Sequence, residues 1–151
     1  MRRRTFIAAG AASAAALAAP RLAVAAPKGD AGLIYAVADA EWKLLGVVDA
    51  SLGDSSLSPD HVRLISRIRE HEVDHSAALD TFLEALGSEK PRPAAPPGSG
   101  LGAIAGHKRA VLAAQRAAAR ELIDAKLLQS IATMAGCEGQ HLVAIERALE
   151  A

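Results

Sequence analysis

The chain has few cysteines and few aromatic residues. It contains one cysteine, Cys137, so a disulfide within the chain is excluded. Aromatic residues make up only 3% of the sequence, and no segment alternates β-branched or aromatic residues with polar ones, so no strand is predicted. Stability must therefore come from helix packing or from a bound metal ion, and we predict an all-α protein.

The N-terminus has the composition of an export signal rather than of a folded segment. Three arginines at positions 2–4 precede an Ala-rich apolar run, and Ala23-Val24-Ala25 forms a small-x-small cleavage site. The order Arg3-Arg4-Thr5-Phe6-Ile7 resembles the twin-arginine signal of bacterial exported proteins. Pro20 and Arg21 interrupt the apolar run before it reaches the ~20 residues that a membrane span needs. We therefore expect cleavage of residues 1–25, a periplasmic or secreted product, and no stable membrane span after cleavage.

The charge balance of the remaining chain argues against nucleic acid as a partner. Cleavage removes four arginines and no acid, so Lys+Arg falls from 17 to 13 against 17 Asp+Glu, a net charge near −4. No basic patch with interleaved aromatic residues is left. Residues 26–151 suffice for one domain with one core. This composition and charge are compatible with a homodimer.

Four helices are predicted, in two pairs. They cover about residues 30–51, 59–86, 101–122 and 124–151. Ser58 is a typical N-cap with Pro59 at the first helical position, and Gly87 is a typical helix end. The Pro-rich segment 88–100 is the one long linker. At ~3.1 Å per residue it can cover ~40 Å, close to the ~42 Å length of a 28-residue helix. We therefore predict a four-helix bundle of two antiparallel hairpins joined by a long crossover.

Two Glu-x-x-His pairs are the strongest functional signal. Glu72 and His75 lie in one apolar helical stripe, and Glu138 and His141 lie in another, 66 residues later. Four of the ten residues that follow each pair are also identical at this offset, which indicates an internal repeat with the two pairs facing each other. A buried carboxylate would take up a proton unless its charge were compensated, and a metal ion compensates the charge of both pairs. The repeat therefore predicts a metal site in the middle of the bundle.

The first helix adds a further carboxylate, because Glu41 shares a stripe with Val37, Leu44 and Val48. With this residue, positions 30–151 resemble the ferritin-like superfamily, and more narrowly exported bacterial ferritin-like domain proteins with twin-arginine signals. The motifs that carry the resemblance are Ala40-Glu41-Trp42, Arg69-Glu70-His71-Glu72-Val73-Asp74-His75 and Cys137-Glu138-Gly139-Gln140-His141. The resemblance implies two metal ions, held by one Glu from each of two helices and a Glu-x-x-His pair from each of the other two.

The third helix departs from this family pattern, because it lacks the second bridging Glu. The 66-residue offset maps Glu41 onto His107, which we take as the expected ligand. A second register, through Ile104, Lys108, Val111 and Gln115, would instead direct Gln115 inward. The missing anionic ligand indicates an altered site with one or two ions of iron, manganese or zinc, and weak iron oxidation as an activity.

Two other interpretations remain open. In the first, the protein is a metal-free helical bundle with a structural or interaction role, in which the Glu and His side chains pair with one another. In the second, His71-Glu72-x-x-His75 is the His-Glu-x-x-His motif of a zinc peptidase, although such enzymes use a strand edge to align substrate. On the ferritin-like interpretation, His71 flanks the site and Cys137 is a small buried residue.

Overall fold

The computed structural model describes residues 29–94 and 96–151. In this part of the chain there are four helices and no strand: α1 (Asp30–Leu52), α2 (Pro59–Ala85), α3 (Gly100–Glu121) and α4 (Ala125–Glu150). The prediction of an all-helical, four-helix protein is confirmed. The export signal and its cleavage site lie outside the described residues. None of the four helices is both long enough and apolar enough to cross a bilayer.

Local sequence explains where the helices begin and end. The side chain of Ser58 accepts a hydrogen bond from the backbone N–H of His61, which satisfies one free donor at the start of α2. Asp124 does the same for two backbone N–H groups at the start of α4. After α2 the chain turns at Gly87, which has φ of +66° and therefore needs a residue without a side chain.

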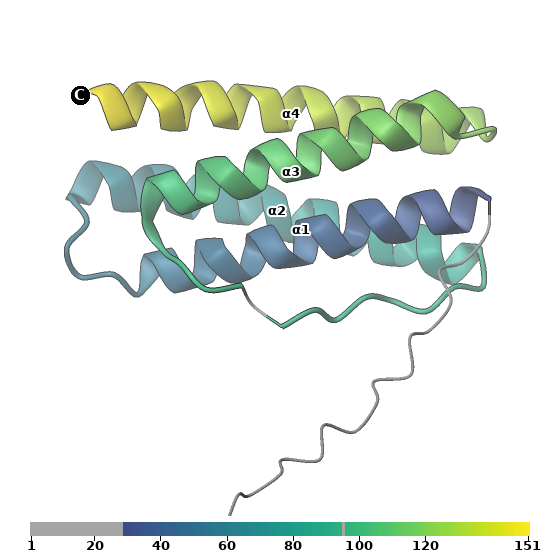
Figure 1. Ribbon diagram of the computed structural model, residues 1–151, viewed down its shortest axis with the longest axis horizontal. Coiled ribbons are helices and arrows are strands. Elements are labelled where there is room, and N and C mark those ends of the chain that lie inside the picture. Colours follow the sequence, from purple (N-terminus) through teal and green to yellow (C-terminus); the bar gives the residue numbers. More distant parts are fainter. Residues whose placement is uncertain (1–28, 95) are drawn as a thin grey trace, which may run out of the picture.

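The linker between α2 and α3 runs along the length of the bundle, so α3 begins at the end where α2 begins (Figure 1). Contacts hold the linker to the helices. The guanidinium of Arg92 lies 4.4 Å from the ring centre of Trp42 and donates to Asp80 over 3.1 Å. At the other end, the backbone N–H of Gly100 donates to Ser51 over 2.8 Å.

The four helices do not pack equally closely. Helix α1 packs against α2 and α3, and α3 packs against α4, whereas α2 and α4 have few close backbone approaches. The space between α2 and α4 is a cavity of about 530 Å³. This opening gives solvent a route from the surface towards the middle of the bundle.

The apolar core has two parts with a polar layer between them. One part, around Val37, Leu79 and Ile131, fills one half of the bundle, and the other, around Leu44, Ile68 and Ile145, fills the opposite half. Polar side chains at the middle of every helix separate the two parts. The fully or almost fully buried polar residues of this layer are Glu41, Glu72, Ser76, Lys108, Gln115, Glu138 and His141.

Candidate metal centre

The polar layer brings together three carboxylates and an imidazole. Glu41 comes from α1, Glu72 and His75 from α2, and Glu138 from α4. One potential ligand atom from each lies within 4.8 Å of the others, and all three Glu side chains are fully buried. We call these four residues the inner cluster. Their convergence follows from the stripes in the sequence, since each carboxylate takes the place of an apolar residue on the inward face of its helix.

A buried lysine lies beside the inner cluster. The ammonium of Lys108 on α3 donates hydrogen bonds to Glu72 Oε1 and Glu138 Oε2, and Lys108 is fully buried. The same nitrogen lies 3.0 Å from His141 Nδ1. Two carboxylates therefore share an ammonium group supplied by the protein, and part of the negative charge that would attract metal ions is compensated.

The pKa values of Glu41 and Glu72 are shifted in opposite directions. Burial, followed by the charges of Glu138 and Glu72, raises the pKa of Glu41 well above its usual value. Burial also acts to raise the pKa of Glu72, but the hydrogen bond with His141 and the charge of Lys108 outweigh it and lower the pKa to about 2. Glu41 is therefore the carboxyl of the inner cluster that tends to hold a proton, and Glu72 stays ionised.

The remaining contacts orient the inner cluster. His75 Nδ1 lies 2.9 Å from Glu138 Oε1 and 3.8 Å from Glu41 Oε1. Gln115 on α3 donates from Nε2 to Glu41 Oε1 over 3.1 Å. Each carboxylate is thus fixed by at least one neighbour, which is how second-layer contacts hold metal ligands in place.

Two oxygens of the inner cluster have no hydrogen-bond partner among the described residues, namely Glu41 Oε2 and Glu72 Oε2. A buried carboxylate oxygen without a partner is unfavourable, and such oxygens are ordinary ligands of divalent ions. The side chains therefore fit one ion between Glu41, Glu72, His75 and Glu138. They do not fit two ions equally well, because the ammonium of Lys108 is already bonded to two of the three carboxylates.

The structure places five of the six expected ligands around the middle of the bundle. Glu41, Glu72, His75 and Glu138 form the inner cluster, and His141 contacts it through Nδ1, which is 3.4 Å from Glu72 Oε1. His107 does not join them: it is half-buried and belongs to neither group of converging ligands among the described residues.

The register of α3 explains the position of His107. The stripe through Ile104, Lys108, Val111 and Gln115 is the inward face, so mapping His107 by the 66-residue offset selected the wrong face. Lys108 is the residue beside the inner cluster whose contribution sequence reasoning missed, although it lies in that stripe. A lysine among apolar residues at helical spacing was the available signal.

The two histidines of the peptidase motif point to different places. His75 belongs to the inner cluster, whereas His71 Nδ1 lies 2.8 Å from His141 Nε2 and 3.6 Å from the sulfur of Cys137. The Glu between them, Glu72, is bound to Lys108 and has a pKa of about 2, far below that of an effective general base near neutral pH. The described residues therefore do not form the zinc-and-base arrangement that the motif would need.

Comparison with known proteins adds no assignment: no family model, no curated protein and no solved structure matches the chain. The geometry of the buried Glu and His side chains is compatible with binding a metal ion. The function must therefore be argued from this geometry.

Proposed function

We propose that the protein is an exported, ferritin-like metal-binding protein whose inner cluster holds one divalent ion. The ligands are Glu41, Glu72, His75 and Glu138. The observation that carries the proposal is the pair of buried oxygens, Glu41 Oε2 and Glu72 Oε2, that have no hydrogen-bond partner among the described residues once Glu41 is ionised. Bound there, the ion supplies the positive charge that the buried carboxylates lack.

The charges support one ion rather than two. Three ionised carboxylates and the ammonium of Lys108 leave a net charge of −2, which one divalent ion neutralises. A second divalent ion would leave an uncompensated positive charge in a buried layer. Binding of the one ion also requires Glu41 to lose its proton, since its raised pKa marks it as the protonated carboxyl of the inner cluster.

The same charges argue against efficient iron oxidation. The ferritin-like arrangement uses two adjacent ions, and here a protein ammonium is bonded to two of the carboxylates that would hold them. Among iron, manganese and zinc, oxygen-rich ligation suits manganese and ferrous iron, and the imidazole of His75 also admits zinc. We propose metal binding as the function, with ferrous iron oxidation weak.

A metal-free bundle is the second candidate, and Lys108 is the observation that favours it. Its ammonium compensates Glu72 and Glu138 without any ion, and a protonated Glu41 needs no compensation. On this interpretation, the polar layer fixes the register of the four helices and has no ligand.

Calorimetric titration of the chain lacking residues 1–25 separates the two candidates. The metals are Mn²⁺, Zn²⁺ and Fe²⁺, and the Fe²⁺ titration is carried out without oxygen. We expect one ion per chain at the inner cluster. Glu72→Ala combined with Glu138→Ala should abolish this binding and leave the far-UV dichroism spectrum helical. If none of the three metals binds to the wild-type chain, the metal-free bundle is correct.

The matched control is Glu70→Ala combined with Glu150→Ala. Both residues are exposed and lie on α2 and α4, the helices of Glu72 and Glu138. Replacing them removes the same total charge as the test variant. The control should bind metal like the wild type. Equal loss of binding in both double variants would mean that net charge, rather than the inner cluster, attracts the metal.

A further inference from the structure

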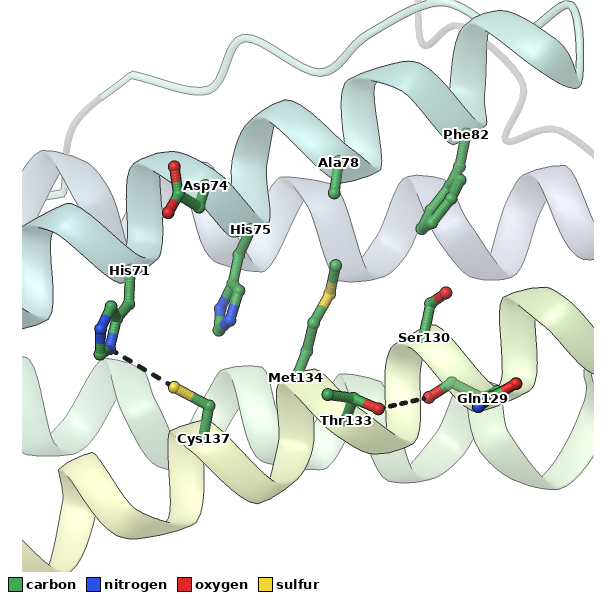
Figure 2. A pocket seen from close by; sticks show the side chains of 10 residues that line it. All are labelled: His71, Asp74, His75, Ala78, Phe82, Gln129, Ser130, Thr133, Met134 and Cys137. Carbon is green, nitrogen blue, oxygen red and sulfur yellow. Dashed lines mark hydrogen bonds between the residues drawn. The ribbon is translucent and has the colours of Figure 1, made fainter.

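A second group of potential metal ligands lies on the α2–α4 side of the polar layer. His71 comes from α2, and Cys137 and His141 come from successive turns of α4. We call these three residues the outer cluster. Figure 2 shows the imidazole of His71 and the sulfur of Cys137 directed towards each other across the space between the two helices.

The three ligand atoms form a compact triangle. His71 Nδ1 and His141 Nε2 are 2.8 Å apart, and the sulfur of Cys137 is 3.6 Å from each of them. The point equidistant from all three atoms is therefore roughly 2 Å from each, close to the typical 2.0–2.1 Å of a zinc–nitrogen bond and the 2.3 Å of a zinc–sulfur bond. Such a triangle needs only small side-chain movements to hold an ion.

Access and chemistry distinguish the outer cluster from the inner one. His71 is exposed, and His71 and Cys137 both line the cavity between α2 and α4, so an ion can enter from solvent and keep an open coordination position. One thiolate and two imidazoles favour zinc or cuprous copper over manganese or magnesium. By contrast, the inner cluster offers three carboxylates and one imidazole.

We propose that His71, Cys137 and His141 form a second metal site, distinct from the inner cluster, that takes a thiolate-preferring ion, with Zn²⁺ as the ion to test first. On binding, the thiol of Cys137 gives its proton to water, and the two imidazoles bind through His71 Nδ1 and His141 Nε2. His71 Nε2 carries the other proton of its ring.

The environment of His141 supports this role. A metal on Nε2 requires the ring proton on Nδ1, and Glu72 Oε1, 3.4 Å away, is the acceptor for it. The ammonium of Lys108 lies 3.0 Å from the same Nδ1, so in the metal-bound form it donates to Glu72 and Glu138 and not to this nitrogen. A carboxylate that accepts the second ring proton of a metal-bound histidine fixes its tautomer and orientation. His141 therefore lies between the two sites, with one nitrogen directed to each.

The competing explanation is that the three side chains only contact one another. The rings of His71 and His141 are stacked with centres 5.0 Å apart, and one ring nitrogen can donate to the other. The thiol would then be a weak additional partner. This explanation predicts no effect of metal on Cys137.

The chain has a single cysteine, so a thiol reagent reports on Cys137 alone. The experiment measures the rate of alkylation of the chain lacking residues 1–25 by iodoacetamide, with and without Zn²⁺. We expect Zn²⁺ to slow alkylation at least tenfold, since a metal-bound thiolate is a poorer nucleophile. With Co²⁺ in place of Zn²⁺, a thiolate-to-cobalt charge-transfer band should appear and be absent in Cys137→Ser.

Three variants locate the effect. His71→Ala should abolish protection by Zn²⁺, and because His71 is exposed, this variant should still fold. Ser130→Ala, which lines the same cavity on α4 but is not one of the three ligands, should retain protection. Glu41→Gln removes a ligand of the inner cluster only, so it should also retain protection even though its inner cluster no longer binds metal.

The outcomes separate this site from the proposed function. No protection in the wild type, or equal protection in His71→Ala, would falsify the second site and leave the inner cluster unaffected. Loss of protection in Glu41→Gln with retention in His71→Ala would show that Zn²⁺ acts through the inner cluster, and would also overturn the second site. Protection that depends on His71 supports the second site even if calorimetry finds no ion at the inner cluster.

Discussion

Gln115 donates a hydrogen bond from Nε2 to Glu41 Oε1 over 3.1 Å, in the middle of the buried polar layer. Gln115 thus occupies an inward position of α3 that contacts Glu41 of α1. Its other amide atom, Oε1, has no partner among the described residues. A neutral amide here keeps the number of carboxylates at three, and it limits the positive charge that the layer can accept.

Replacing this amide tests that limit directly. Gln115→Glu places a fourth carboxyl in the layer, beside Glu41. The amide that donates to Glu41 is then replaced by a second acidic group, so we expect the metal-free protein to lose about 1–3 kcal/mol of stability. Divalent metal should restore the stability and bind more tightly than in the wild type. Thermal unfolding with and without Mn²⁺ measures both effects. Equal stabilisation by Mn²⁺ in the variant and the wild type would contradict this prediction.

The number and approximate limits of the helices could be predicted from the sequence because they depend on local signals. Ser58, Pro59 and Gly87 mark the ends of α2, and the apolar stripes mark the inward faces of the helices. Glu41 and the Glu-x-x-His pairs were found in the same way, since each interrupts an apolar stripe.

The inward face of α3 could not be assigned with the same certainty. This helix is rich in alanine, and alanine is compatible with both the core and the surface, so two registers remained. The structure directs Lys108 and Gln115 inward because an ammonium and an amide find partners among the carboxylates of the other helices. That choice depends on tertiary contacts, which a single helix does not contain.

Lys108 should decide how many ions the layer can hold. Lys108→Met keeps a long side chain but removes the charge, which leaves Glu72 and Glu138 without their cation. Removing one partner of a buried ion pair typically costs about 3–5 kcal/mol, and we expect a loss of this size without metal. With Mn²⁺ present, which the outer cluster disfavours, we expect the stoichiometry to rise from one ion towards two. Urea unfolding and metal analysis by mass spectrometry measure the two effects.

The exposed neighbour Arg109 provides the control for this variant. Arg109→Met removes the same charge from α3 but only an exposed ion pair with Glu146, so its effect on stability should stay below about 1 kcal/mol. If Lys108→Met were as stable as Arg109→Met and bound no additional metal, the ammonium would not be acting as the resident cation of the layer.

Glu41 and Glu72 should give opposite pH dependences in the metal-free protein. The pKa of Glu72 is lowered to about 2 from 4.5, so this group contributes stability above about pH 4.5 that is lost as the pH falls towards 2. By linkage the contribution is about 3 kcal/mol. The pKa of Glu41 is raised, so its contribution is present below pH 4.5 and is lost as the pH rises towards its raised pKa.

Two glutamine variants test these signs by urea unfolding between pH 3 and 8. Glu72→Gln should be destabilising at pH 7 and much less so at pH 3. Glu41→Gln, which imitates the protonated carboxyl, should be nearly neutral at pH 4 and stabilising at pH 8. Parallel curves for both variants and the wild type would show that neither carboxyl titrates differently in the folded and unfolded chains.

Export through the twin-arginine pathway is the remaining proposal, and it rests on Arg3 and Arg4 in the sequence. That pathway reads the arginine pair itself, so Lys at both positions preserves the charge but should prevent recognition. We expect the double variant to accumulate in the cytoplasm at precursor length, with residues 1–25 still attached. Arg2→Lys, which changes an arginine outside the pair, is the control and should be processed normally. Mature-length protein outside the cytoplasm at wild-type levels in the double variant would mean that a different route exports the chain.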